Sequence, residues 1–198
     1  MKKMIIGLGT GRCGSMSLSN LLSFQEGCIV SHEIGGRPWL PWKRNIKLFE
    51  NYFNSIYSRN YEIIGDVSFY NLPYASDYLN KNEKTVFVIL RRDKEETIKS
   101  YLKKTEGRNH WIAHNGSKWR LDSWDKCYPK FDVTEKEAAL SAYYDHYYDL
   151  CNQLPQEKCF WMKTSELNNE QKCLDMLKFC GLEEIKFFNV HNNKGRKT

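Results

Sequence analysis

The sequence lacks the features that mark membrane-spanning, zinc-binding and disulfide-bonded proteins. None of its apolar runs approaches the roughly 18 residues that a transmembrane helix requires. Its seven cysteines are scattered, without a Cys-x-x-Cys pair or the spacing of zinc ligands. We therefore expect reduced thiols, as in a cytoplasmic protein, with no membrane association and no bound metal.

The composition is that of a globular domain with a basic surface. Hydrophobic residues make up 41% of the 198 residues and aromatic residues 14%, which is enough to build one core. The net charge of +6 is spread among many acidic residues rather than gathered into runs. This favours a basic pocket for a small polyanion over a nucleic-acid surface. We predict a single domain over residues 1–198 that does not bind nucleic acid; the oligomeric state stays open.

The rest of the chain is organised around a glycine-rich stretch, residues 7–18. It follows a short apolar run, Met4-Ile5-Ile6, that predicts a buried strand, and leucines at helical spacing come after it. Glycines allow a tight turn, and the N–H groups of a helix that begins there attract an anion. Arg12 adds a fixed positive charge. The stretch therefore predicts a cradle for phosphate or sulfate.

The glycine spacing alone is compatible with several kinds of site. Gly9-x-Gly11-x-x-Gly14 fits the dinucleotide fingerprint, with Glu33 near the place of the ribose-binding acid, so an NAD(P)-dependent Rossmann oxidoreductase is one alternative. A P-loop-like small-molecule kinase is another, although Ser15-Met16 replaces the Lys-Ser/Thr pair of that loop. The same spacing also fits a non-catalytic nucleotide-binding module, or a tight turn that binds no ligand.

A second strand-to-helix junction narrows the choice. Residues 85–90 predict a buried strand, and residues 91–102 predict the helix that follows it. Arg92 stands at the carboxyl end of the strand, and Ser100 follows eight residues later, about two helical turns on. A dinucleotide-binding site would not explain why Arg92 and Ser100 stand at these positions.

With both junctions in view, the chain resembles the sulfotransferase family that uses 3′-phosphoadenosine 5′-phosphosulfate (PAPS). The family's first loop, Lys/Arg-Ser-Gly-Thr-Thr-x-Leu, corresponds to residues 12–18, with Cys13 and Met16 as departures. Its second motif, a strand ending in Arg with Ser eight residues on, corresponds to Arg92 and Ser100, with Lys94 in place of a proline. The resemblance implies a three-layer α/β fold with a mostly parallel central sheet, and these cofactor-binding residues: Gly11, Arg12, Cys13, Gly14, Ser15, Met16, Ser17, Leu18, Arg92 and Ser100.

The resemblance also implies the reaction. A sulfuryl group would pass from PAPS to a hydroxyl or amine of a small-molecule or carbohydrate acceptor, leaving 3′-phosphoadenosine 5′-phosphate (PAP), without a metal. Arg12 and the loop amides would stabilise the leaving phosphate, while Arg92 and Ser100 would hold the 3′-phosphate. The family places a base at the end of the second strand, where Glu33 and His32 stand. Glu33 is the first choice and His32 the second.

The remaining chain continues the alternation of strands and helices. This alternation predicts right-handed βαβ units and a parallel sheet, with the site at the carboxyl ends of the strands. Residues 106–132 break the pattern with tryptophans among polar residues, so we predict a lid or an acceptor-binding insertion there. The other expected strands are 28–31, 61–67 and 159–162, and the other expected helices are 46–56, 72–79, a tyrosine-rich one after 134, and 169–180.

Overall fold

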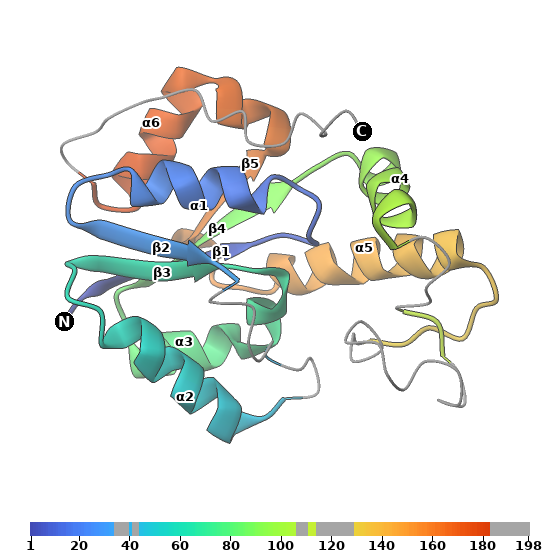
Figure 1. Cartoon of the computed structure of the whole chain (residues 1–198), viewed down its shortest axis with the longest axis horizontal. Helices are drawn as coiled ribbons and strands as arrows, with labels where there is room; N and C mark the ends of the chain where they lie inside the picture. Colours follow the sequence, from blue (N-terminus) through green and yellow to red (C-terminus); the bar gives the residue numbers. More distant parts are fainter. Residues whose placement is uncertain (34–39, 41–43, 106–110, 114–128, 183–198) are drawn as a thin grey trace.

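The computed structural model describes residues 1–33, 40, 44–105, 111–113 and 129–182, and these form one α/β unit around a five-stranded sheet. All paired strands are parallel, and their order across the sheet is β2-β3-β1-β4-β5 (Figure 1). This confirms the predicted α/β class with a parallel central sheet. The strands are β1 Lys3–Leu8, β2 Cys28–His32, β3 Ile63–Val67, β4 Thr85–Arg91 and β5 Cys159–Lys163.

Helices cover both faces of the sheet. In Figure 1, α1 and α6 lie above it, and α2 and α3 lie below it. Consecutive residues of β1 alternate between the two cores, because Ile5 packs with α1 and α6 while Met4 and Ile6 pack with α2 and α5. This explains why Met4, Ile5 and Ile6 of β1 are all apolar. The helices are α1 Ser15–Ser23, α2 Ile46–Tyr57, α3 Ala75–Lys81, α4 Lys94–Thr105, α5 Lys136–Asn152 and α6 Glu170–Phe179, and the short 3₁₀ helices are η2 Phe69–Tyr74, η4 Gln156–Lys158 and η5 Thr164–Asn168.

Two helix starts differ from those predicted. Helix α4 begins at Lys94 rather than at Arg91, because the Asp93 carboxylate accepts a hydrogen bond from the Glu96 amide (2.9 Å) and caps the helix. The sequence Thr134-Glu135-Lys136-Glu137 has the form of a capping box and predicts a helix capped by Thr134. This prediction is wrong, since α5 begins after Glu135 and no side chain caps it. The sequence pattern thus predicted that both helices exist, but it did not predict their first residues correctly.

The strand order brings the ends of β1, β3 and β4 together at the middle of the carboxyl edge. Strand β3 lies between β2 and β1, which differs from the Rossmann order, in which the second strand adjoins the first. Glu33 therefore follows a strand that is not a neighbour of β1, and the Rossmann alternative loses its basis.

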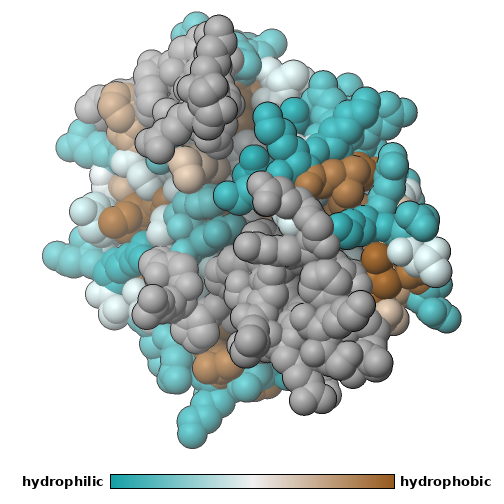
Figure 2. Space-filling model, turned by 45° about the vertical axis from the view of Figure 1, so that its right-hand side comes forward, coloured by the Kyte–Doolittle hydropathy of each residue, from teal (hydrophilic) through white to brown (hydrophobic). Residues whose placement is uncertain are grey.

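Figure 2 shows the surface of one face of the molecule. On this face the described residues are mostly hydrophilic, with separate hydrophobic patches.

Part of the predicted insertion packs on the domain. Trp111 is buried and stacks on Tyr143 of α5, with ring centroids 4.3 Å apart, while Ile112 forms a parallel bridge to Phe131. The insertion's other residues, 106–110 and 114–128, lie outside the described residues, as do most of the 35–42 loop and the C-terminal residues 183–198. Along the described stretches, no helix has the length and apolar content needed to cross a membrane.

Gly65 offers a test of the strand packing. A Cβ built at this residue overlaps the carbonyl oxygen of Ile5 on the neighbouring strand. Backbone atoms cannot move aside as a flexible side chain can. We therefore expect Gly65→Ala to lower the free energy of unfolding, measured by urea titration, by at least about 1–3 kcal/mol. Gly27→Asn is the control, because a Cβ there meets only the Glu62 side chain at 3.9 Å, and Asn adopts the left-handed φ of 67° at this position more readily than most residues do. Equal losses in the two variants would contradict the predicted clash.

Candidate functional site

The turn after β1 contains three residues in left-handed backbone conformations. Gly11 and Gly14 have positive φ angles of 84° and 90°, and Arg12 between them also lies in the left-handed region at 56°. A non-glycine residue there costs about 1–2 kcal/mol, and such strain tends to occur at functional sites. The sequence motif therefore forms an irregular turn, with Arg12 exposed on its outside.

Tyrosine hydroxyls from two helices hold the backbone of this turn. The Gly9 amide donates to the hydroxyl of Tyr147 on α5 (2.9 Å). The Thr10 carbonyl accepts hydrogen bonds from Tyr143 of α5 (3.0 Å) and Tyr101 of α4 (2.5 Å). The shape of the turn thus depends on α4 and α5. The tyrosines of α5 provide hydrogen bonds to this turn, which the spacing of tyrosines in the sequence did not indicate.

Helix α1 begins directly at the turn. Gly14 is its N-cap residue, and no side chain caps the helix there. The first N–H groups of any α-helix have no acceptor within the helix, and here these are the amides of Ser15, Met16 and Ser17. The helix dipole favours an anion beside them. The order of strand, glycine turn and helix start is therefore as the sequence predicted.

The side chains of the loop residues face in different directions. Cys13 and Leu18 are fully buried, and Ser17 nearly so, so only the backbone of these residues is open to a ligand. Burial raises the pKa of the Cys13 thiol to about 11. Met16, by contrast, is 42% exposed. Of the loop's polar side chains, Arg12 and Ser15 are the ones placed to contact a ligand.

The two sequence motifs meet in space. The Arg12 Nε donates to the Ser100 hydroxyl of α4 at 3.1 Å, and the Arg92 guanidinium donates to the Arg12 carbonyl at 3.1 Å. Arg92 also pairs with Glu96, one helical turn ahead (3.0 Å). Residues 80 or more positions apart therefore form one basic cluster beside the glycine turn.

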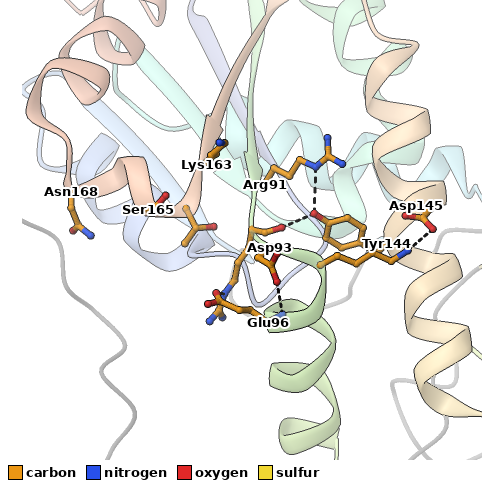
Figure 3. Close-up of a pocket in the computed structure, with 11 residues that line it drawn as sticks. Arg91, Asp93, Glu96, Tyr144, Asp145, Lys163, Ser165 and Asn168 are labelled. Carbon is orange, nitrogen blue, oxygen red and sulfur yellow. Dashed lines mark hydrogen bonds and ion pairs between the residues drawn. The ribbon is translucent and has the colours of Figure 1, made fainter.

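A cavity of about 720 Å³ lies beside this cluster, between the ends of β4 and β5. Its walls also include the start of α4, Tyr144 of α5 and the residues of η5 (Figure 3). Thr164 in the wall donates a hydrogen bond to the Cys13 carbonyl (2.7 Å), so the cavity adjoins the glycine turn directly. The volume is typical of sites for molecules the size of a nucleotide.

The cavity wall includes two strand-end cations, Arg91 and Lys163, that were not among the predicted site residues. Arg91 and Lys163 are register partners on β4 and β5, and both line the cavity. Arg91 donates to the Tyr144 hydroxyl (3.3 Å) and lies over the Tyr148 ring, 5.1 Å from its centroid, as expected for a cation–π contact. In the described part of the chain neither residue forms an ion pair with a carboxylate, whereas Lys94 pairs with Asp145 (2.6 Å). The sequence feature that could have identified both residues is a basic residue at the carboxyl end of each strand.

The two candidate bases lie at the end of β2. Ser15 and His32 meet there, with 2.9 Å between the hydroxyl oxygen and Nε2. Burial lowers the pKa of His32, so its ring is neutral near pH 7. Burial raises the pKa of Glu33, the negative charge of Asp66 raises it further, and Arg12 lowers it. Glu33 also has a left-handed φ of 48°.

Asp66 of β3 is a fully buried carboxylate. It accepts hydrogen bonds from Ser31 (2.8 Å), Tyr52 (2.6 Å) and Asn71 (3.1 Å). These donors stabilise its charge inside the protein. Asp66 therefore acts on Glu33 from inside the sheet rather than facing a substrate itself.

Comparison with known proteins gives a fold but no family. No family model and no curated protein matches the chain. A sulfotransferase from Alicyclobacillus acidocaldarius superimposes with a TM-score of 0.55 at 16% identity, covering 92% of this chain and 82% of that one. The YorR protein from Bacillus subtilis, solved in complex with phosphorylated GDP, has a TM-score of 0.49 at 16% identity, covering 91% of this chain and 96% of that one. The sulfotransferase structure shares the α/β fold of this chain.

The support of the turn by tyrosine can be tested at Tyr147. We expect Tyr147→Phe to lower the free energy of unfolding by about 1–3 kcal/mol, because the buried Gly9 amide loses its acceptor. Hydrogen exchange at the Gly9 amide should become faster. Tyr57→Phe is the control, since this ring packs on Phe53 away from the turn. Unchanged stability and exchange in Tyr147→Phe would show that the turn does not need this hydroxyl.

Proposed function

We propose that the protein is a sulfotransferase that moves a sulfuryl group from PAPS to a hydroxyl or amine of a small-molecule or carbohydrate acceptor. The observation that supports this most is the contact between the two motifs, through Arg12, Ser100 and Arg92. PAPS carries anionic groups on both its 5′ and its 3′ side. A site for it needs donors for two separate groups within the span of one nucleotide.

We assign one group of donors to each end of the nucleotide. The uncapped N-terminus of α1 and Arg12 would bind the 5′-phosphosulfate, since backbone N–H groups and a guanidinium suit a phosphate. Arg92 and Ser100 would bind the 3′-phosphate. The adjoining cavity would take the adenosine, with Arg91 and Tyr144 along one wall.

We further propose that Glu33 is the general base. In the reaction the sulfur–oxygen bond to the 5′-phosphate breaks, a bond to the acceptor oxygen forms, and the acceptor proton passes to the base. PAP leaves with the charge of the broken bond, which Arg12 and the α1 amides would stabilise. The raised pKa of Glu33 suits proton transfer near neutral pH. Its left-handed backbone is the kind of strain found at active sites.

The donor can be identified by calorimetry with PAP, AMP, ATP with Mg²⁺ and NAD(P)H. We expect tight binding of PAP and weak binding of AMP, which lacks the 3′-phosphate. Arg92→Ala should reduce the preference for PAP over AMP about 10–100-fold, the cost of a hydrogen bond to a charged group. Arg44→Ala, which removes an equal charge that is paired with Asp77 of α3, should leave the preference unchanged.

Other outcomes of this titration would contradict the proposal. Binding of NAD(P)H or of ATP with Mg²⁺, without binding of PAP, would reject a PAPS site and favour an oxidoreductase or a kinase. Equal discrimination between PAP and AMP in wild type and Arg92→Ala would reject the role of Arg92. Tight PAP binding without turnover of PAPS on any of a panel of phenols, sugars and amines would favour a binding module.

The base can be tested on any acceptor from that panel. We expect Glu33→Gln to lower kcat by about 10²–10⁴ while PAP binds as tightly as before, because the amide cannot accept the proton. In the wild type, kcat should fall as the pH drops through a pKa above the ordinary 4.5 of Glu, since only the carboxylate is active. Full turnover by Glu33→Gln would show that the base lies elsewhere.

A further inference from the structure

Helix α1 is attached to strand β2 by a row of serine hydroxyls. Ser19 and Ser23 each donate to the Val30 carbonyl at 2.7 Å. Ser15, one helical turn before Ser19, continues this row, but its partner is the His32 side chain at 2.9 Å. The first two contacts fix how the helix lies on the strand. The third is different because Ser15 belongs to the anion-binding turn of the helix.

The direction of this hydrogen bond decides what Ser15 can do. A serine hydroxyl has one proton to donate and two lone pairs that accept. If Ser15 donates to His32, no proton is left for an anion at the helix N-terminus. If the Nε2–H of His32 donates to Ser15, the serine proton is free to point at a phosphate oxygen. A neutral imidazole can donate in this way only in the tautomer with its proton on Nε2.

We propose that His32 is a positioning residue, which donates its Nε2–H to Ser15 and thereby directs the Ser15 hydroxyl at the 5′-phosphate of the nucleotide. This inference rests on the proposed function, because it takes the nucleotide to lie at the N-terminus of α1. The proposal assigns different roles to the neighbouring residues His32 and Glu33. His32 serves donor binding, and Glu33 serves the acceptor.

The chemistry of the pair agrees with this division. The Nε2 of His32 faces the Ser15 hydroxyl at 2.9 Å, so this ring nitrogen is not available to an acceptor. The ring remains neutral because burial opposes its charge. Donation from a neutral ring keeps the pair uncharged, so that Arg12 and the amides of α1 supply the attraction to the anion, and Ser15 supplies direction.

The test is a double-mutant cycle on PAP affinity. We expect Ser15→Ala to weaken PAP binding about 10-fold or more, as for a lost hydrogen bond to a charged group. His32→Ala should weaken it by a similar factor, and the double variant should be no weaker than Ser15→Ala alone. Ser23→Ala is the matched control, because its hydroxyl also joins α1 to β2 but at the far end of the helix. It should bind PAP as the wild type does.

Conservative variants separate positioning from mere support of the fold. The side-chain amide of Gln reaches about as far as Nε2 of histidine, whereas that of Asn reaches only about as far as Nδ1. His32→Gln should therefore restore PAP affinity to within about 3-fold of wild type, and His32→Asn should not. Nitrogen-15 NMR of the histidine rings should show the Nε2–H tautomer for the signal that His32→Gln removes.

The outcomes distinguish this inference from the proposed function. A wild-type protein that does not bind PAP would reject both. PAP binding with additive losses in the cycle, or with equal affinity in His32→Gln and His32→Asn, would reject only the role of His32. An Nδ1–H tautomer in the complex with PAP would also reject it, since Nε2 would then be the acceptor.

Discussion

The shape of the glycine-rich turn after β1 depends on hydroxyl groups that reach it from distant helices. A glycine-rich turn has many conformations in the unfolded chain, and its polar backbone atoms need partners once they are buried. Tyr147 and Tyr143 supply those partners to Gly9 and Thr10. Two further tyrosines of α5 act in the same way on β4 and the residue after it, where Tyr148 donates to Leu90 (2.7 Å) and Tyr144 to Arg92 (2.5 Å).

One helix therefore orders both halves of the candidate site. Because its tyrosines contact the ends of β1 and β4 together, α5 holds the glycine turn and Arg92 in one relative position. An anion-binding site benefits from donors that are fixed before the ligand arrives, since ordering them afterwards would lower the affinity. The cost is a row of hydroxyls within an otherwise apolar core, which all require partners.

The opposite side of the turn is arranged by different means. Strand β2 is an edge strand, separated from β1 by β3, and it reaches the site only through the residues at its carboxyl end. There Ser15 meets His32, and the buried charge of Asp66 acts on Glu33. A neutral histidine and a carboxylate of raised pKa thus lie next to each other in sequence with different electrostatic surroundings.

The amino-acid sequence determined the strands, most helices and the two motifs at the strand-to-helix junctions, because these depend on local periodicity and on glycine and arginine at set distances. The strand order, and with it the position of Glu33 relative to the glycine turn, came only with the tertiary structure. So did the roles of the tyrosines, Arg91 and Lys163. Tyr147 lies 138 residues from Gly9, and Arg91 meets Lys163 only because β4 pairs with β5. Such contacts depend on how whole elements pack, and no local pattern encodes that.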